Sequence, residues 1–134
     1  MKKFITLALV FIMCVFAISC ADADGGKMLY EEDTVLGSGS TTITFVVEHF
    51  DGKMVTFTIK TDKTVLSDAL LEHELIEGEN DIYGLYVKKV NGITQDFNKD
   101  RTYWALYVDG AYSMEGVSSV KIKEGQTYTY RVSR

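Results

Sequence analysis

The stretch Tyr103–Gly110 constrains the fold more than any other part of the chain, because it combines a strict strand alternation with a turn signal. Side chains of an extended strand point alternately to opposite faces, so every second residue from Trp104 to Val108 shares one face. The other face also carries aromatic side chains. Because Asp109-Gly110 readily takes the positive φ angles of a tight turn, the chain is predicted to fold back. We place the returning strand at residues 117–122.

The middle of the chain predicts a hairpin followed by a helix. Apolar and polar residues alternate over 42–47 and over 55–60, and Asp51-Gly52 lies between these segments as a turn signal. Residues 65–75 then change to helical spacing, with an apolar face and a charged face. Short strands follow, and Asn91-Gly92 supplies another hairpin signal.

This order of elements predicts the fold class. A two-stranded ribbon needs a further layer to cover its apolar face, and one helix lying across a mixed sheet provides that layer. We therefore expect an α+β domain over residues 41–134, with a β-grasp-like arrangement of an N-terminal β-hairpin, one helix and several short strands. Other small α+β folds fit the same pattern.

The carboxy-terminal motifs resemble a known family. Its pattern is a tryptophan strand that ends in an Asn/Asp-Gly turn, a short Gly-Val connection, and a glycine-containing turn before the last strand. The corresponding residues here are Tyr103–Gly110, Gly116-Val117, Lys123–Gln126 and Thr127–Val132. The chain thus resembles the C-terminal domain of transcobalamin and intrinsic factor, with its bacterial relatives on secreted lipoproteins. The resemblance covers residues 41–132 and implies a domain that presents one face to cobalamin or another tetrapyrrole-like ligand.

The amino terminus has the marks of an export signal. Lys2 and Lys3 precede a short apolar run, and Ala17–Cys20 resembles a bacterial lipobox. That resemblance implies removal of residues 1–19, lipidation of Cys20 and a membrane-anchored lipoprotein at the cell surface or on the periplasmic face. Two alternatives are an ordinary signal cut near Ser19 or Ala21 and an uncleaved anchor that extends through Ala21.

Cysteine usage agrees with lipid attachment. The chain has two cysteines, and Cys14 lies in the predicted signal, so no disulfide is available to the exported domain. Residues 20–40 are rich in glycine, serine and aspartate, which is typical of a flexible tether. In the alternative interpretation, Met28–Tyr30 packs back on the domain as an edge strand.

Charge and motif content exclude several functions. The formal net charge is −5 and the basic residues are scattered, which argues against nucleic acid as a partner. Neither His49 nor His73 has the neighbours of a metal site, and the mature domain lacks a nucleophile motif. We expect a protein that is not an enzyme and that uses no cofactor and no metal.

The aromatic content favours binding. Tyrosine combines large apolar area with a hydroxyl group that tolerates water, so an exposed tyrosine face suits a planar ligand or a protein. The candidate ligand-binding residues are Tyr103, Trp104, Tyr107, Tyr112, Tyr128 and Tyr130. Alternation alone leaves open which face of each strand is core. The alternatives to a cobalamin-binding lipoprotein are a protein-interaction module and an adhesive or structural surface domain without a small-molecule ligand.

Overall fold

The computed structural model describes residues 26–134. The predicted signal peptide over residues 1–19 and the lipidation of Cys20 lie outside these residues. Within residues 26–134, no helix is long and apolar enough to cross a membrane.

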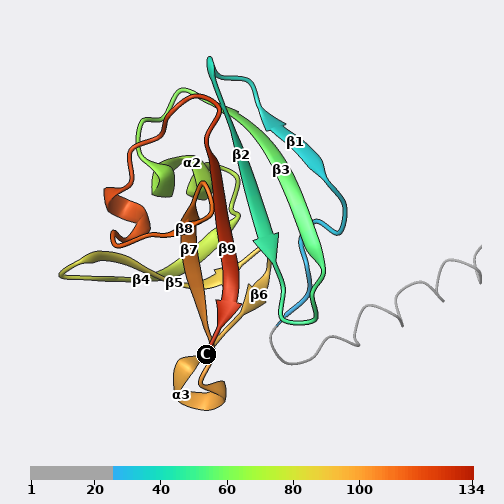
Figure 1. Cartoon of the computed structure of the whole chain (residues 1–134), viewed down its shortest axis with the longest axis vertical. Coiled ribbons are helices and arrows are strands. Elements are labelled where there is room, and N and C mark those ends of the chain that lie inside the picture. Colours follow the sequence, from blue (N-terminus) through green and yellow to red (C-terminus); the bar gives the residue numbers. More distant parts are fainter. Residues whose placement is uncertain (1–25) are drawn as a thin grey trace, which may run out of the picture.

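A six-stranded mixed sheet forms the larger layer of the domain (Figure 1). Its strand order is β1-β3-β2-β9-β7-β8. The strands are β1 (Thr34–Gly37), β2 (Thr41–Glu48), β3 (Met54–Thr61), β7 (Tyr103–Val108), β8 (Ala111–Tyr112) and β9 (Thr127–Ser133). Strands β2 and β3 form the predicted antiparallel hairpin, while the last long strand, β9, runs parallel to β2.

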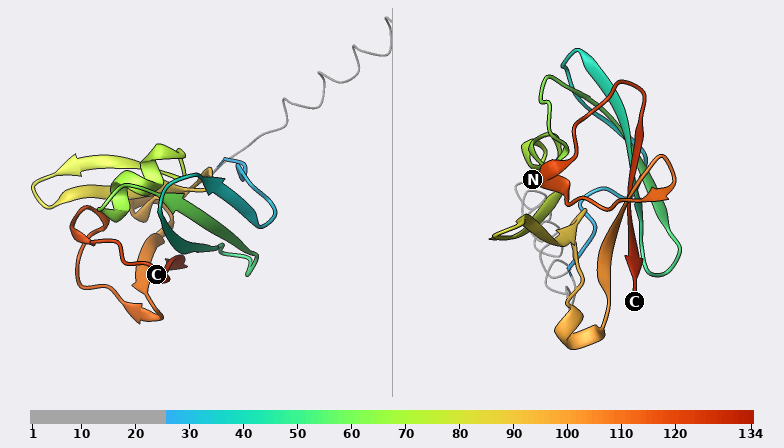
Figure 2. Two further views of the ribbon diagram at one scale, coloured as in Figure 1. Left: turned by 90° about the horizontal axis from the view of Figure 1, so that it is seen from above. Right: turned by 60° about the vertical axis from the view of Figure 1, so that its left-hand side comes forward.

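The second layer covers one face of this sheet. It consists of the helix α2 (Leu66–Glu72), the strands β4 (Ile76–Asp81), β5 (Gly84–Val90) and β6 (Ile93–Thr94), and the short 3-10 helix η2 (Val117–Ser119). A further short helix, α3 (Phe97–Asp100), leads into β7. The right-hand view of Figure 2 shows the long sheet nearly edge-on, with α2 and the β4–β5 hairpin on one side of it.

The core fills the space between the two layers. Alternate side chains of the central strands are fully buried, among them Phe45, Phe57, Ile59 and Tyr128. The helix contributes Leu66 and the smaller sheet contributes Ile76. Burial of this apolar face provides the main stabilisation, since the described residues contain no cysteine.

Several sequence predictions are confirmed. The domain is mostly β-sheet with few helices, its main sheet is mixed, and the helix α2 lies on one face of that sheet. Gly52, Asn91 and Asp109 lie in the predicted turns. At Asn91 and Asp109, φ is 51° and 49°, as the tight-turn signals predict.

Two predicted elements differ from the structure. Residues 117–122 do not form a strand beside β7. Val117 instead starts η2, and the partner of β7 on that side is the short β8. The helix is also shorter than 65–75 because Glu74 takes the left-handed φ of 57° and ends it.

The tether prediction for residues 20–40 needs correction where the structure describes it. Residues 34–37 form β1, which pairs in parallel with β3. Met28–Tyr30 packs back as the alternative proposed, although without strand geometry. Asn91 holds this segment: its Oδ1 accepts from Tyr30 N at 2.9 Å, its Nδ2 donates to Tyr30 O at 2.9 Å, and its own carbonyl accepts from Leu29 N at 3.1 Å.

Replacing Asn91 with alanine tests this attachment. The variant leaves the backbone groups of Tyr30 without side-chain partners and puts alanine at a left-handed φ, so we expect the free energy of unfolding to fall by about 2–3 kcal/mol. Asn80→Ala on exposed β4 is the matched control and should cost less than about 0.5 kcal/mol. Urea unfolding of both variants measures the difference. Equal losses would contradict the role of Asn91.

Candidate functional site

A groove of about 350 Å³ lies between β5, β7 and the loop that follows β8. We call it the aromatic groove. Most of its lining residues are of aromatic or apolar type, and the segment Ser113–Gly116 adds polar groups. The lining residues are Leu85, Tyr86, Val87, Tyr103, Trp104, Ala105, Leu106, Tyr112, Ser113, Met114, Glu115, Gly116, Val117 and Tyr130.

An open strand edge explains why the groove forms here. Strand β8 pairs only with Tyr107 and Val108, so the earlier half of β7 has no strand on the side away from β9. The carbonyl of Leu106 accepts from Ser113 N on that side. Because alternate residues of an antiparallel strand direct their backbone groups to the same edge, those of Trp104 also point toward the groove.

The floor of the groove is a packed aromatic cluster. Trp104 is 6% exposed, and its Nε1 donates to the carbonyl of Ile93 at 3.1 Å. Its ring meets Tyr130 edge-on at a centroid distance of 6.5 Å and His49 at 6.1 Å. Burial raises the pKa of Tyr130 far above its ordinary value. Tyr130 therefore stays neutral over the physiological range and offers an apolar surface with an uncharged hydroxyl group.

The rim, in contrast, is exposed and apolar. Tyr112 is 56% exposed and Met114 is 90% exposed. Tyr86 on β5 is also exposed, and the β4–β5 turn beyond it presents Ile82 and Tyr83 to solvent. Exposed apolar side chains that gather around a groove mark a contact surface more often than exposed side chains scattered singly.

One carboxylate belongs to the groove lining. Ser113 Oγ donates to the carbonyl of Glu115 at 2.8 Å and accepts from Glu115 N at 3.1 Å, which closes a small turn. The turn fixes the backbone of Glu115 and leaves its side chain exposed at the mouth. Neither Lys nor Arg occurs in the lining that the structure describes.

Four of the six predicted residues line this groove, namely Tyr103, Trp104, Tyr112 and Tyr130. Only the rings of Trp104 and Tyr130 lie on its side of the sheet. Tyr103 lies on the outer face with Tyr107, and the rings of Tyr112 and Tyr107 are 5.7 Å apart between centroids. The other two lie elsewhere. Tyr107 is on the outer face of the sheet, where the guanidinium of Arg131 lies 4.3 Å from its ring centroid and also binds Glu48 at 2.9 Å. That bond to Glu48 raises the pKa of Arg131.

Tyr128 is a core residue and a correction to the candidate set. Its ring is fully buried, and its hydroxyl group donates to Gln126 Oε1 at 2.6 Å while accepting from Lys123 N at 3.1 Å. Burial raises its pKa even though the Lys123 hydrogen bond opposes that shift. Its position opposite Val108 in the β7–β9 ladder fixes it on the covered face.

Sequence reasoning missed three residues of the site: Tyr86, Met114 and Glu115. Their neighbours in sequence give no binding signal, because the groove forms only when β5 approaches β7. The available clue was a methionine two residues before the Gly116-Val117 motif.

With this geometry in place, comparison with known proteins identifies the family. A family described as "Domain of unknown function (DUF4430)" matches residues 62–133, more than half of the chain. The chain belongs to this family. No curated protein matches it.

Solved structures share the fold of this DUF4430 domain. A candidate metal-binding protein from Ruminococcus gnavus is 23% identical with a TM-score of 0.67, covering 70% of this chain and 97% of that one. Haptocorrin in complex with Cbi is 23% identical with a TM-score of 0.54, covering 74% of this chain. The chain spans 26% of haptocorrin. Haptocorrin is of the transcobalamin family, so the resemblance predicted from the sequence is confirmed.

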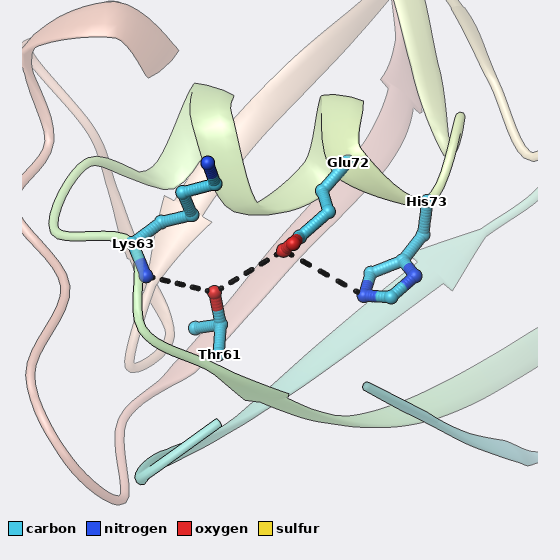
Figure 3. A network of polar contacts seen from close by, with 4 residues as sticks. All are labelled: Thr61, Lys63, Glu72 and His73. Atoms are coloured by element: carbon cyan, nitrogen blue, oxygen red, sulfur yellow. Dashed lines mark hydrogen bonds and ion pairs between the residues drawn. The ribbon is translucent and has the colours of Figure 1, made fainter. Parts of the chain in front are cut away.

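A second hollow of the DUF4430 domain, about 540 Å³, lies beside β1 and the end of α2. Figure 3 shows its polar network. Thr61 Oγ1 accepts from Lys63 N at 3.0 Å and donates to Glu72 at 3.4 Å. His73 Nε2 is 3.9 Å from the same carboxylate, too long for a hydrogen bond, so this contact is an ion pair only when His73 is protonated.

The side chains of the DUF4430 domain that could bind a metal are dispersed over the described residues. Across residues 26–134, no three His, Cys, Asp or Glu side chains are grouped to hold a metal ion. His49 Nδ1 contacts the carbonyl of Lys53 at 2.9 Å, which ties that ring to its own hairpin. The Nε2 atoms of His49 and His73 are buried without a hydrogen-bond partner, but neither belongs to a group of three metal-ligating side chains among the described residues. The aromatic groove remains the stronger candidate site.

Proposed function

We propose that this chain is the non-catalytic ligand-binding domain of an exported, membrane-anchored lipoprotein, and that the ligand binds in the aromatic groove. The observation that carries the proposal is the continuity between a buried aromatic floor and an exposed apolar rim. Trp104 and Tyr130 are packed and held in place, whereas Met114 in the loop after β8 lies open to solvent. The floor side chains are already ordered in the free protein, so a ligand that binds to them does not lose affinity to the entropy of immobilising them.

A corrinoid or related tetrapyrrole is the proposed ligand. Haptocorrin, which shares the fold, was crystallised with Cbi, and this supports a ring ligand for the present chain. A groove of about 350 Å³ is at the lower end of the size range for small-molecule sites, ~300–1,000 Å³. We therefore propose that the groove receives one edge of the ring and leaves the remainder exposed.

The chemistry of the lining supports binding rather than catalysis. Ser113 Oγ is engaged on both sides by the backbone of Glu115, so it is not prepared as a nucleophile. The order β3-β2-β9-β7, with β2 and β9 parallel, supports a β-grasp type for the fold. The lipobox-like Ala17–Cys20 supports anchoring at the cell surface or periplasmic face.

The second candidate function is recruitment of a protein partner at the cell surface. It is favoured by Ile82 and Tyr83, which occupy the tip of the β4–β5 hairpin and are 87% and 83% exposed. Turn tips ordinarily carry polar residues or glycine, so two large apolar side chains there suggest a contact. The carbonyl of Tyr83 lies next to Gly116, which places this tip beside the groove rim.

Calorimetric titration of the full chain with cobalamin and with cobinamide tests the proposed function. We expect binding heat, a ligand-dependent rise in Tm, and a Kd about tenfold higher in Met114→Ser, which corresponds to ~1.4 kcal/mol. Met114 is exposed, so that variant should remain folded. Phe50→Ser, an exposed aromatic outside the groove, is the control and should bind normally. Absence of heat and of any Tm shift at about 1 mM ligand would refute the proposal.

A further inference from the structure

We infer that the open edge of β7 in the aromatic groove binds an extended peptide segment of a partner protein, which adds to the sheet as a further antiparallel strand. This inference rests on the proposed function in taking the groove as the binding site. It also names, for the second candidate function, the part of the partner that binds. Recognition is by main-chain groups and needs no particular side chain of the groove.

The first argument is the direction of the backbone groups along β7. Asp109 N donates to the carbonyl of Thr127 at 2.7 Å, so the odd-numbered residues of β7 direct their backbone groups toward β9. Ser113 N donates to the carbonyl of Leu106 at 2.9 Å, so the even-numbered residues direct theirs to the opposite edge. Trp104 is even-numbered and precedes the part of β7 that β8 pairs. Its N–H and C=O groups therefore point into the groove.

The second argument is that these two groups are unpaired. Within residues 26–134, neither the N–H nor the C=O group of Trp104 has a hydrogen-bond partner, although the residue is only 6% exposed. More than about 90% of buried backbone groups in folded proteins are paired, so an unpaired donor and acceptor in a groove indicate a binding edge. One residue of an antiparallel strand satisfies both groups, because it exchanges two hydrogen bonds with the residue opposite.

The third argument is that this edge lacks the features that prevent strand addition. Exposed edges are usually protected by charged side chains, proline or a bulge. Strand β4, the edge of the smaller sheet, carries Glu77, Glu79 and Asp81, and its register shifts between Glu77 and Gly78. Residues 103–106 of β7 carry no charged side chain, and their register with β9 is regular. The fold thus protects the edge of β4 and leaves that of β7 open.

The surroundings of the edge define the partner segment. The segment continues the line of β8 and runs antiparallel to β7. Four residues of β7 line the groove, which is about 13 Å at ~3.3 Å per residue, so a segment of similar length fits. The side chains of Trp104 and Leu106 lie on the covered face, so every second residue of the partner meets an apolar floor and should be apolar. The residues between them face outward with Tyr103 and should be polar.

A synthetic peptide tests the inference at the level of the main chain. The probe is acetyl-Thr-Val-Thr-Val-Thr-amide, which has the required alternation. Its matched control has both valines N-methylated, so they cannot donate hydrogen bonds to a strand edge. Because main-chain pairing supplies the affinity, we expect the full chain, kept in an uncharged detergent, to bind the probe with a Kd below about 1 mM. The methylated peptide should bind at least about tenfold more weakly. Calorimetry measures both peptides.

Amide-proton NMR locates the bound peptide. The amide proton of Trp104 should move downfield and exchange with solvent at least about tenfold more slowly when the probe is bound, because it gains a hydrogen bond. The amide proton of Tyr107 is the matched control in the same strand. It already faces β9, so its exchange rate should not change.

The outcomes separate this inference from the proposed ring ligand. No binding of the probe at about 1 mM, equal binding of the two peptides, or an unchanged Trp104 amide at saturating probe would overturn the inference. If cobinamide still binds in that case and Met114→Ser weakens it, the ring ligand stands and the strand addition fails. If the probe binds at Trp104 and cobinamide does not bind, strand addition stands and the ring ligand fails. If neither binds, both fail.

Discussion

Replacing Phe57 with alanine should lower the free energy of unfolding by about 3–5 kcal/mol. Phe57 is fully buried on β3, stacks on Phe45 at a centroid distance of 5.8 Å and meets Tyr30 edge-on at 5.3 Å. Removing the ring leaves a cavity between three strands and also frees the N-terminal segment at Tyr30. Since small domains have a total stability of about 5–15 kcal/mol, this loss would leave a large unfolded fraction at 37 °C.

Phe50→Ala is the matched control for this prediction. Phe50 is 63% exposed in the β2–β3 turn, so its truncation should cost less than about 1 kcal/mol. Urea unfolding followed by Trp104 fluorescence measures both variants. A similar loss for the two phenylalanines would show that the described packing of β3 is wrong.

The second large effect concerns membrane attachment. We expect Cys20→Ala to abolish incorporation of a fatty-acid label into the protein, because Cys20 supplies the thiol to which the proposed acyl chain is joined. The label can be an alkyne-bearing palmitate detected after gel electrophoresis. The result is all or none, since residues 21–134 contain no other cysteine to accept the lipid.

Cys14→Ala is the control for the acylation experiment. Cys14 lies within the predicted signal, so its replacement should leave labelling intact. Persistent label in Cys20→Ala would contradict the lipoprotein proposal, and an unlabelled wild-type protein would favour the ordinary signal cut near Ser19 or Ala21.

The parts of the fold that local chemistry determines were predictable from the sequence. The β2–β3 hairpin follows from alternation on both sides of Asp51-Gly52, and the turns at Asn91-Gly92 and Asp109-Gly110 follow from residues that tolerate positive φ. Residues 117–122 were wrongly predicted as a strand. Their buried residues Val117 and Val120 have the three-residue spacing of a 3-10 helix, which the structure forms here.

The parts that depend on distant contacts were not predictable. Residues 34–37 have the composition of a tether, yet they form β1, which pairs in parallel with β3. No local sequence pattern predicts this pairing. Similarly, both faces of β7 are apolar, so only the opposite strand β9 decides that Tyr128 is core. Tyr86 and Glu115 reach the groove from separate elements, which explains why the sequence identified only part of the lining.

The contacts between Asn91 and Tyr30 have a mechanical consequence. Tension applied at the amino-terminal end reaches the domain first at these hydrogen bonds and then at β1, before any force acts on the β2–β3 hairpin. Parallel pairing of β1 with β3 lets several hydrogen bonds share the load when the strands are pulled along their length. Because Asn91 directly follows β5, which forms one wall of the groove, part of that load also reaches the groove.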